Sequence, residues 1–306
     1  MKKAVTLVVI LVVLLLVYWM VESEKPVVST DQQFISADSA SITKLVIHSA
    51  TNDVTLDKQG GVWMVEGDKP YPANERTLGL ALSKFAQMSK KALISERPEK
   101  FTDMEVDDSL GVKVTVYVGD KPTTIYIGKA GPTFQTSYVR LDGSNEIWEV
   151  AGNHRSSFDK KREDWRDKTI NHYEMTDFQK FTLNYPDHSF TLEQLDTLWQ
   201  INTGTQLIDG DAKLVERLTR MISRINAVDF ADTLAEDTFD KPDFQIIADL
   251  VSGEKADIKL KKFGDDKFYL RKAGAVSDYV IYKATAEAMM KQPDDFIRKD
   301  EEKAQK

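Results

Sequence analysis

The 306-residue sequence contains no cysteine. This absence excludes disulfides, thiolate metal sites, a thiol nucleophile and a lipid-modified N-terminal cysteine. The sequence also lacks an excess of basic residues, because 41 Lys and Arg stand against 49 Asp and Glu, for a net charge of −8. Since phosphate binding needs a basic surface, nucleic acid is a poor partner for this chain.

Signatures of catalysis and of cofactor binding are missing as well. The sequence has no His-Glu-x-x-His zinc motif, no Gly-x-Ser-x-Gly elbow of a serine hydrolase and no Gly-rich phosphate loop between a strand and a helix. None of the four histidines stands four residues from another, which is the spacing of a helical zinc pair; they are His48, His154, His172 and His188. We therefore predict no catalytic residue, metal ligand or cofactor, and an enzyme is the less favoured class.

Two acidic clusters are the remaining candidates for chemistry, because carboxylate oxygens are ligands of calcium. The clusters are Asp103, Glu105, Asp107 and Asp108 in the first half of the chain, and Asp237, Asp240 and Asp243 in the second. Their spacing fits no EF-hand loop, so solvated acidic loops are the expected structure. The alternative of an exported hydrolase that uses Asp240 and Asp243, or of a glycan- or solute-binding protein, stays open.

One long uncharged apolar run is present at the N-terminus. Residues 4–21 would form a helix about 27 Å long, close to the thickness of a bilayer core, and Lys2 and Lys3 place its start in the cytoplasm. A cleaved secretory signal is the alternative, but its apolar region is usually shorter, and Val21-Glu22-Ser23 is a poor cleavage site. We predict a single-pass anchor in the inner membrane over residues 1–21, with the body exported to the periplasmic side.

An internal repeat organises the rest of the chain. Lys44-Leu45-Val46-Ile47 recurs as Lys180-Phe181-Thr182-Leu183, and Trp63 recurs as Trp199, at a constant offset of 136 positions. Equal spacing without a gap indicates that one supersecondary plan is built twice. Further along, Tyr138-Val139-Arg140 returns as Tyr269-Leu270-Arg271 at an offset of 131. Five residues are therefore lost from loops of the second copy.

Each copy follows the same order of patterns. Three short β-type runs form a meander and are followed by apolar residues at helical spacing, with Leu78, Leu82 and Phe85 matching Leu214, Leu218 and Met221; Asp209 or Asp211 is a candidate N-cap. The predicted fold is α+β, with two tandem modules, each a mainly antiparallel sheet with one packed amphipathic helix. The expected boundaries are a tether over 22–40, modules over 41–170 and 171–300, and a charged tail over 301–306.

The chain resembles a known family through Trp63 and Trp199, which close the two meanders, and through the junction Trp165-Arg166-Asp167-Lys168 before an apolar β run. That family is the exported, membrane-anchored bacterial proteins catalogued as domain of unknown function 4340. One departure is visible, because Leu110-Gly111 and Phe239-Asp240-Lys241-Pro242 only partly match a Tyr-Gly-Leu-Asp-x-Pro-like segment of the family. The resemblance implies an envelope protein, often encoded beside ABC-transporter components similar to those of gliding-motility systems, and no established reaction.

The candidate residues for a structural or binding role are those that the repeat or the junction singles out. Arg140 and Arg271 are equivalent in the two copies and could be buried structural charges or halves of a ligand clamp. Trp165, Arg166, Asp167 and Lys168 are candidates for structural or interaction roles. The favoured function is a non-enzymatic accessory or interaction subunit of an ABC-transporter-linked envelope assembly, with protein partners and a membrane contact through residues 4–21.

Overall fold

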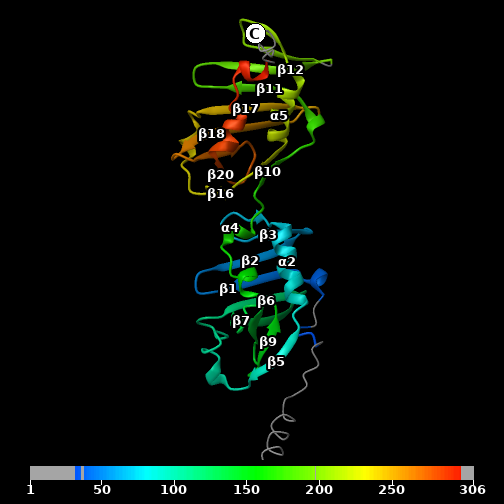
Figure 1. Ribbon diagram of the computed structural model, residues 1–306, viewed down its shortest axis with the longest axis vertical. Helices are drawn as coiled ribbons and strands as arrows, with labels where there is room; N and C mark the ends of the chain where they lie inside the picture. Colours follow the sequence, from blue (N-terminus) through cyan, green and yellow to red (C-terminus); the bar gives the residue numbers. More distant parts are fainter. Residues whose placement is uncertain (1–31, 36–37, 197, 298–306) are drawn as a thin grey trace, which may run out of the picture. The chain divides into compact units, whose positions relative to one another are not determined.

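The computed structural model describes residues 32–35, 38–196 and 198–297 (Figure 1). The predicted anchor over residues 1–21, part of the tether and the tail over 301–306 lie outside these ranges. Within them, no helix combines the length and the apolar character needed to cross a membrane. The described chain divides into two compact units, one formed by residues up to Glu66 with Glu75–Trp165, the other by Gly67–Asn74 with the residues from Arg166 onward.

The first unit is an antiparallel sheet with its strands in the order β3-β2-β1-β6-β7-β8-β9-β5. The strands are β1 (Lys44–His48), β2 (Asp53–Gln59), β3 (Val62–Val65), β5 (Lys90–Ser95), β6 (Val112–Val118), β7 (Lys121–Ala130), β8 (Thr136–Leu141) and β9 (Ile147–Ala151). Inward residues alternate along β6, where Val112, Val114 and Val116 are buried, as expected of a strand with one face on a core.

Helix α2 (Glu75–Ala86) lies across one face of this sheet (Figure 1). Its buried residues include Leu78, Leu82 and Phe85, which confirms the helical spacing read from the sequence. Four shorter elements complete the described part of the first unit: the 3-10 helices η1 (Ser39–Ser41) and η2 (Pro98–Lys100), and the single-turn helices α3 (Arg155–Phe158) and α4 (Arg162–Trp165).

The second unit is built on a sheet with the order β14-β13-β12-β11-β17-β18-β19-β20-β16. Its strands are β11 (Phe178–Asn184), β12 (Ser189–Leu195), β13 (Leu198–Asn202), β14 (Leu207–Gly210), β16 (Asp229–Phe230), β17 (Phe244–Leu250), β18 (Lys255–Phe263), β19 (Lys267–Lys272) and β20 (Tyr279–Tyr282). A separate antiparallel pair joins β10 (Thr169–His172) to β15 (Arg224–Asn226). Helices α5 (Ala212–Ser223) and α6 (Lys283–Met289), with η3 (Met175–Asp177), η4 (Glu236–Phe239) and η5 (Pro293–Phe296), fill the connections.

Helix α5 begins where the sequence supplies an N-cap residue. Asp211 is the N-cap, and its side chain accepts a hydrogen bond from the Lys213 backbone N–H at 2.8 Å. The helix buries Val215, Leu218 and Ile222, whereas the expected Leu214 and Met221 are only partly buried at the flanks of the stripe. The prediction of mainly antiparallel sheets with few helices is confirmed.

One short segment departs from the order expected from the sequence. The periodicity places Gly67–Asn74 in the first module, yet these residues belong to the second unit. The segment contains β4 (Tyr71–Pro72), and the Tyr71 side chain joins the hydrophobic core of the second unit with only 5% of its surface exposed. Burial of a large aromatic ring explains this assignment, because it removes more apolar surface from water than any other residue of the segment could.

Candidate functional site

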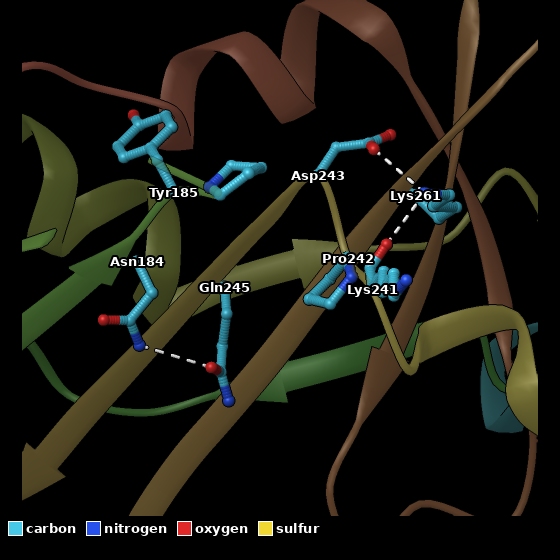
Figure 2. Close-up of a pocket in the computed structure, with 8 residues that line it drawn as sticks. Asn184, Tyr185, Lys241, Pro242, Asp243, Gln245 and Lys261 are labelled. Atoms are coloured by element: carbon cyan, nitrogen blue, oxygen red, sulfur yellow. Dashed lines mark hydrogen bonds and ion pairs between the residues drawn. The ribbon is translucent and has the colours of Figure 1, made fainter. Parts of the chain in front are cut away.

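A pocket of about 430 Å³ opens in the second unit, where β11 ends and β17 begins (Figure 2). Two amide side chains, Asn184 and Gln245, lie next to each other in its lining, with the Asn184 Nδ2 donating to the Gln245 Oε1 at 3.2 Å. The full lining is Asn184, Tyr185, Pro186, Lys241, Pro242, Asp243, Gln245 and Lys261. The pocket therefore includes Asp243, a residue of the second acidic cluster in the sequence.

The carboxylate of Asp243 is already fully engaged. Lys261 donates from Nζ to its Oδ1 at 3.0 Å, and the Lys262 backbone N–H donates to its Oδ2 at 2.8 Å. The same ammonium donates to the Lys241 carbonyl at 2.8 Å. Asp240 is exposed and does not line the pocket. Asp240 and Asp243 therefore do not face one pocket together, as the paired carboxylates of a glycoside hydrolase do.

The aromatic side of the pocket is held in place by a stacked ring pair. The rings of Tyr185 and His188 lie 4.6 Å apart and nearly parallel, and the Tyr185 hydroxyl donates to the Lys291 carbonyl at 2.7 Å. His188 contacts the Asp187 carboxylate through Nδ1 at 2.8 Å and the Gln292 amide through Nε2 at 2.9 Å. The hydrogen bond to Asp187 raises the pKa of His188. These contacts brace the loop after β11.

A second histidine shows the opposite shift. His154 is buried in the first unit, with Nε2 placed 2.6 Å from the Ala151 carbonyl, and burial lowers its pKa. The unfolded chain therefore binds this proton more readily, and the first unit is expected to lose stability as the pH falls below about 6.5. Urea unfolding at pH 7 and pH 5 checks this result. His154→Gln should show a smaller loss between the two pH values, and an equal loss in both proteins would contradict the assignment.

The acidic cluster of the first unit is divided among local partners. Asp107 accepts hydrogen bonds from the Ser109 and Leu110 backbone N–H groups at 3.1 and 2.9 Å, and hydrogen bonds lower its pKa against the opposing effect of burial. Asp103 pairs with Lys100 at 2.7 Å. Within residues 32–35, 38–196 and 198–297, no group of three His, Asp or Glu side chains has a geometry that could hold a metal ion. These contacts hold the shape of the loop between β5 and β6.

Arg140 and Arg271, which the sequence pattern paired, each hold the loop that carries an acidic cluster in their own unit. Arg140, on β8, donates from Nε to the Val106 carbonyl at 3.0 Å, and its guanidinium lies 4.2 Å from the ring centroids of Phe101 and Tyr126. Its side chain is buried. The planar guanidinium is suited to this role, because it can stack on rings while its N–H groups donate in the plane.

Arg271, on β19, makes a related set of contacts in a more open setting. Its Nε and Nη2 donate to the Asp278 carboxylate at 2.8 and 2.7 Å, and its Nη1 donates to the Glu236 carbonyl at 3.0 Å. The guanidinium also lies 4.5 Å from the ring of Phe239. The hydrogen bond with Asp278 raises the pKa of Arg271. Both arginines therefore fasten to its sheet the loop that carries an acidic cluster, Arg140 through the Val106 carbonyl and Arg271 through the Glu236 carbonyl.

Replacing these arginines is expected to have unequal effects. Arg140→Ala should lower the free energy of unfolding by about 2 kcal/mol, since the Val106 carbonyl loses its charged donor and the Phe101 and Tyr126 rings lose the guanidinium that packs on them. Arg271→Ala should cost about 1 kcal/mol, because its side chain is about one-third exposed and solvent screens the pair with Asp278. Urea denaturation of the two variants measures both values. A larger effect at Arg271 would contradict this ranking.

The junction Trp165-Arg166-Asp167-Lys168 is divided between the two units. Trp165 is completely buried in the first unit. In the second, the Asp167 backbone N–H donates to the Pro72 carbonyl at 2.8 Å, and the Lys168 Nζ donates to the Val228 carbonyl at 3.0 Å. Trp165 therefore belongs to the first unit and the three residues after it to the second, a division that the sequence does not reveal.

Arg166 is the centre of the most densely bonded polar cluster at this junction. Its guanidinium bridges to both carboxylate oxygens of Asp232, donates to the Ser277 hydroxyl at 2.6 Å, and lies 3.6 Å from the Phe230 ring and 4.4 Å from the Tyr71 ring. The Tyr71 and Tyr279 hydroxyls are 2.8 Å apart. Burial raises the pKa of both tyrosines, so they stay neutral donors and acceptors.

Sequence reasoning identified Arg166 but missed the tyrosine pair. Tyr71 and Tyr279 are separated by 208 positions, and no spacing rule brings such residues together. The only signal available was that each is an aromatic residue in a short β-type run. The contacts of Arg166 with Asp232 and Ser277, and of Tyr71 with Tyr279, are made within the second unit and are those of a structural clamp.

Comparison with known proteins gives one family. A family model described as Domain of unknown function (DUF4340) matches residues 63–242, more than half of the chain. No curated protein and no solved structure matches significantly. The matched residues include the closing tryptophans Trp63 and Trp199 and the whole junction.

Proposed function

We propose a function in assembly for this chain, which belongs to the DUF4340 family: a single-pass, membrane-anchored subunit whose exported body binds other proteins of an envelope transport complex. The family match supports the resemblance noted in the sequence, and the proposed role was inferred from that resemblance. The ABC-transporter link is part of the proposal. The observation that carries the proposal is an exposed apolar edge on the sheet of the second unit.

That edge is strand β14, and β13 and β12 lie next to it in the sheet. Leu195 pairs with Leu198, and Leu207 pairs with Asn202, so strand alternation puts the three leucine side chains on the same face of the sheet. Each leucine is more than half exposed. Strand β14 ends the sheet and has only four residues. Leu195 and Leu198 lie at one end of this face and Leu207 at the other, with Gln200 and Asp209 between them. An exposed leucine on a short edge strand is suited to binding another chain by strand addition.

Duplication of one module is the second element of the proposal. Lys44 lies opposite Asp57 in the first unit, and Lys180 lies opposite Glu193 in the second, at positions that differ by 136. The meander and the hairpins also follow in the same spatial order in the two sheets. These registers support a repeat, and a repeat places equivalent edges at equivalent positions of the two modules.

The test of the interaction role is purification of the full chain at native expression in mild detergent. Named proteins should copurify, and Leu198→Lys should lose them because a lysine cannot be buried unpaired at an interface. Val251→Lys is the matched control, since Val251 is also exposed in the second unit but lies outside the leucine face. Recovery of the chain alone, or equal recovery of partners with both variants, would count against the role.

The anchor is tested separately. The intact protein should stay in the membrane fraction after an alkaline carbonate wash, because about 18 apolar residues in a helix span the bilayer core. Mass spectrometry of its N-terminal peptide should find the segment 4–21 retained. A mature protein that starts near residue 24 and appears in the soluble exported fraction would disprove the anchor.

A further inference from the structure

A groove lies beside helix α5 of the second unit and has a volume of about 360 Å³. Leu214, Leu218 and Met221 line it from α5, and their spacing of four and three residues puts them in one row on the helix surface. At about 1.5 Å per residue, this row is about 10 Å long. Ala288 on α6 and Phe296 on η5 complete the apolar lining of this surface, the α5 groove.

The walls of the α5 groove are held together by packing and by a backbone hydrogen bond. Leu218 and Phe296 are almost completely buried, whereas Leu214 and Met221 are only partly buried. The Asp211 backbone N–H donates to the Phe296 carbonyl at 2.8 Å, which ties η5 to the start of α5, and α6 packs against α5. Because these walls are already in place, a partner that fills the groove has little order to impose on this chain.

Two cations and one carboxylate line the α5 groove. Arg217 lies on α5, and Lys291 follows α6. Neither charged group has a hydrogen bond or an ion pair within the part of the chain that the structure describes. The carboxylate is that of Asp295, and it accepts a hydrogen bond from the Gln292 backbone N–H at 2.9 Å. The lining is therefore positive, although the whole chain has a net charge of −8.

The shape and the charge of the α5 groove favour one kind of occupant. A recessed apolar row about two helical turns long accepts the side chains of an amphipathic helix, which recur at i, i+3 or i+4, and i+7. Cations beside the row suit carboxylates that flank such an apolar stripe. The nine residues after Ile297 are a poor occupant, because Ala304 is their only apolar residue. A broad lipid surface is a poor occupant too, since the row lies in a recess.

We propose that the α5 groove binds an acidic amphipathic helix of a partner protein. Apolar side chains from successive turns of that helix enter the groove, and its carboxylates pair with Arg217 and Lys291. This inference rests on the proposed interaction role, which it deepens by naming the chemistry of the partner. It also assigns the contact to a surface other than the β14 edge.

The first test measures binding of model peptides to the full chain in mild detergent by fluorescence anisotropy. The probe is a labelled peptide of about 14 residues with leucines at i, i+3, i+4 and i+7 and with glutamates and alanines elsewhere. Its matched control carries lysines in place of the glutamates. The glutamate peptide should bind at least about tenfold more tightly than the lysine peptide, because only its charges complement the groove. Equal binding of the two peptides would contradict the proposal.

Charge reversal locates the contact. Arg217→Glu should reverse the order of the two peptides, and because the Arg217 side chain is exposed, this variant is expected to fold. Lys213→Glu is the matched control: it makes the same charge change on α5, but Lys213 is exposed and does not line the groove. It should leave both affinities within about twofold of those of the native chain. Equal effects of the two variants would mean that the charge of the whole helix, and not the groove, attracts the peptide.

Filling the groove tests the apolar part of the contact. Ala288→Phe should weaken binding of the glutamate peptide at least about tenfold, because the new ring occupies the space that the leucines need. Circular dichroism checks that this variant is folded. Leu198→Lys, at the β14 edge, should bind the peptide as the native chain does. Displacement of the peptide by phosphatidylglycerol added to the detergent micelles would assign the groove to lipid and overturn the proposal.

The possible results separate this inference from the proposed function. If proteins copurify equally well with the native chain and with Arg217→Glu, and the glutamate peptide does not bind, the α5 groove is not a docking site and the interaction role stands. If the peptide binds and follows the charge at position 217 while no protein copurifies, the groove assignment stands and the role in an assembly fails. If neither is found, both proposals fail.

Discussion

Trp165→Ala is expected to lower the free energy of unfolding of the first unit by about 3–5 kcal/mol. The Trp165 side chain is among the largest of the completely buried side chains, and alanine would leave a cavity of nearly its full volume. A close-packed core relaxes only in part around such a cavity. Urea denaturation followed by circular dichroism measures the loss. Since the chain has two compact units, the transition that shifts must be assigned to the first unit.

Trp165→Phe is the matched control for this prediction. The indole Nε1 of Trp165 is buried without a hydrogen-bond partner among the described residues, so phenylalanine removes an unsatisfied donor together with part of the ring. The loss of free energy should therefore be well below that of alanine. Phe296→Ala, at a fully buried ring in the core of the second unit, should destabilise that unit instead. Equal losses for alanine and phenylalanine at position 165 would contradict the packing argument.

Arg166→Ala should destabilise the second unit by about 2–4 kcal/mol. The guanidinium is almost fully buried, and it joins the Asp232 carboxylate, the Ser277 hydroxyl and the rings of Phe230 and Tyr71. Its removal leaves these groups without their common partner. The loss stays below that of a fully buried ion pair because the Asp232 side chain is 43% exposed and can be hydrated by solvent.

Two further variants distinguish charge from geometry in this cluster. Arg166→Lys keeps the charge but cannot bridge both carboxylate oxygens while lying flat on two rings, so it should lose a large part of the stability that alanine loses. Asp232→Asn should cost less, since the arginine keeps Ser277 and the rings. If Arg166→Lys were as stable as the native protein, the planar contacts described for Arg166 would have no energetic importance.

The parts of the fold that were predictable depend on contacts between residues close in the chain. Alternation of apolar residues along β6 and the helical spacing of Leu78, Leu82 and Phe85 follow from the geometry of a strand and a helix, and both are observed. The Asp211 cap is of the same kind, because its partner is two residues away. Arg140 and Arg271 were identified as a pair, but whether they hold a ligand or a loop depended on their surroundings.

The sequence by itself determined the sheet-rich fold class, the family membership and the positions of the main strands and of α2 and α5, since periodic patterns and local caps carry this information. Tertiary structure alone decided that Tyr71 packs in the second unit, that Asp243 is occupied by Lys261, and that Leu207 is left open. The physical reason is that burial and pairing depend on which distant residues meet. A pattern says which face of a strand is apolar, and only the packed chain shows what covers it.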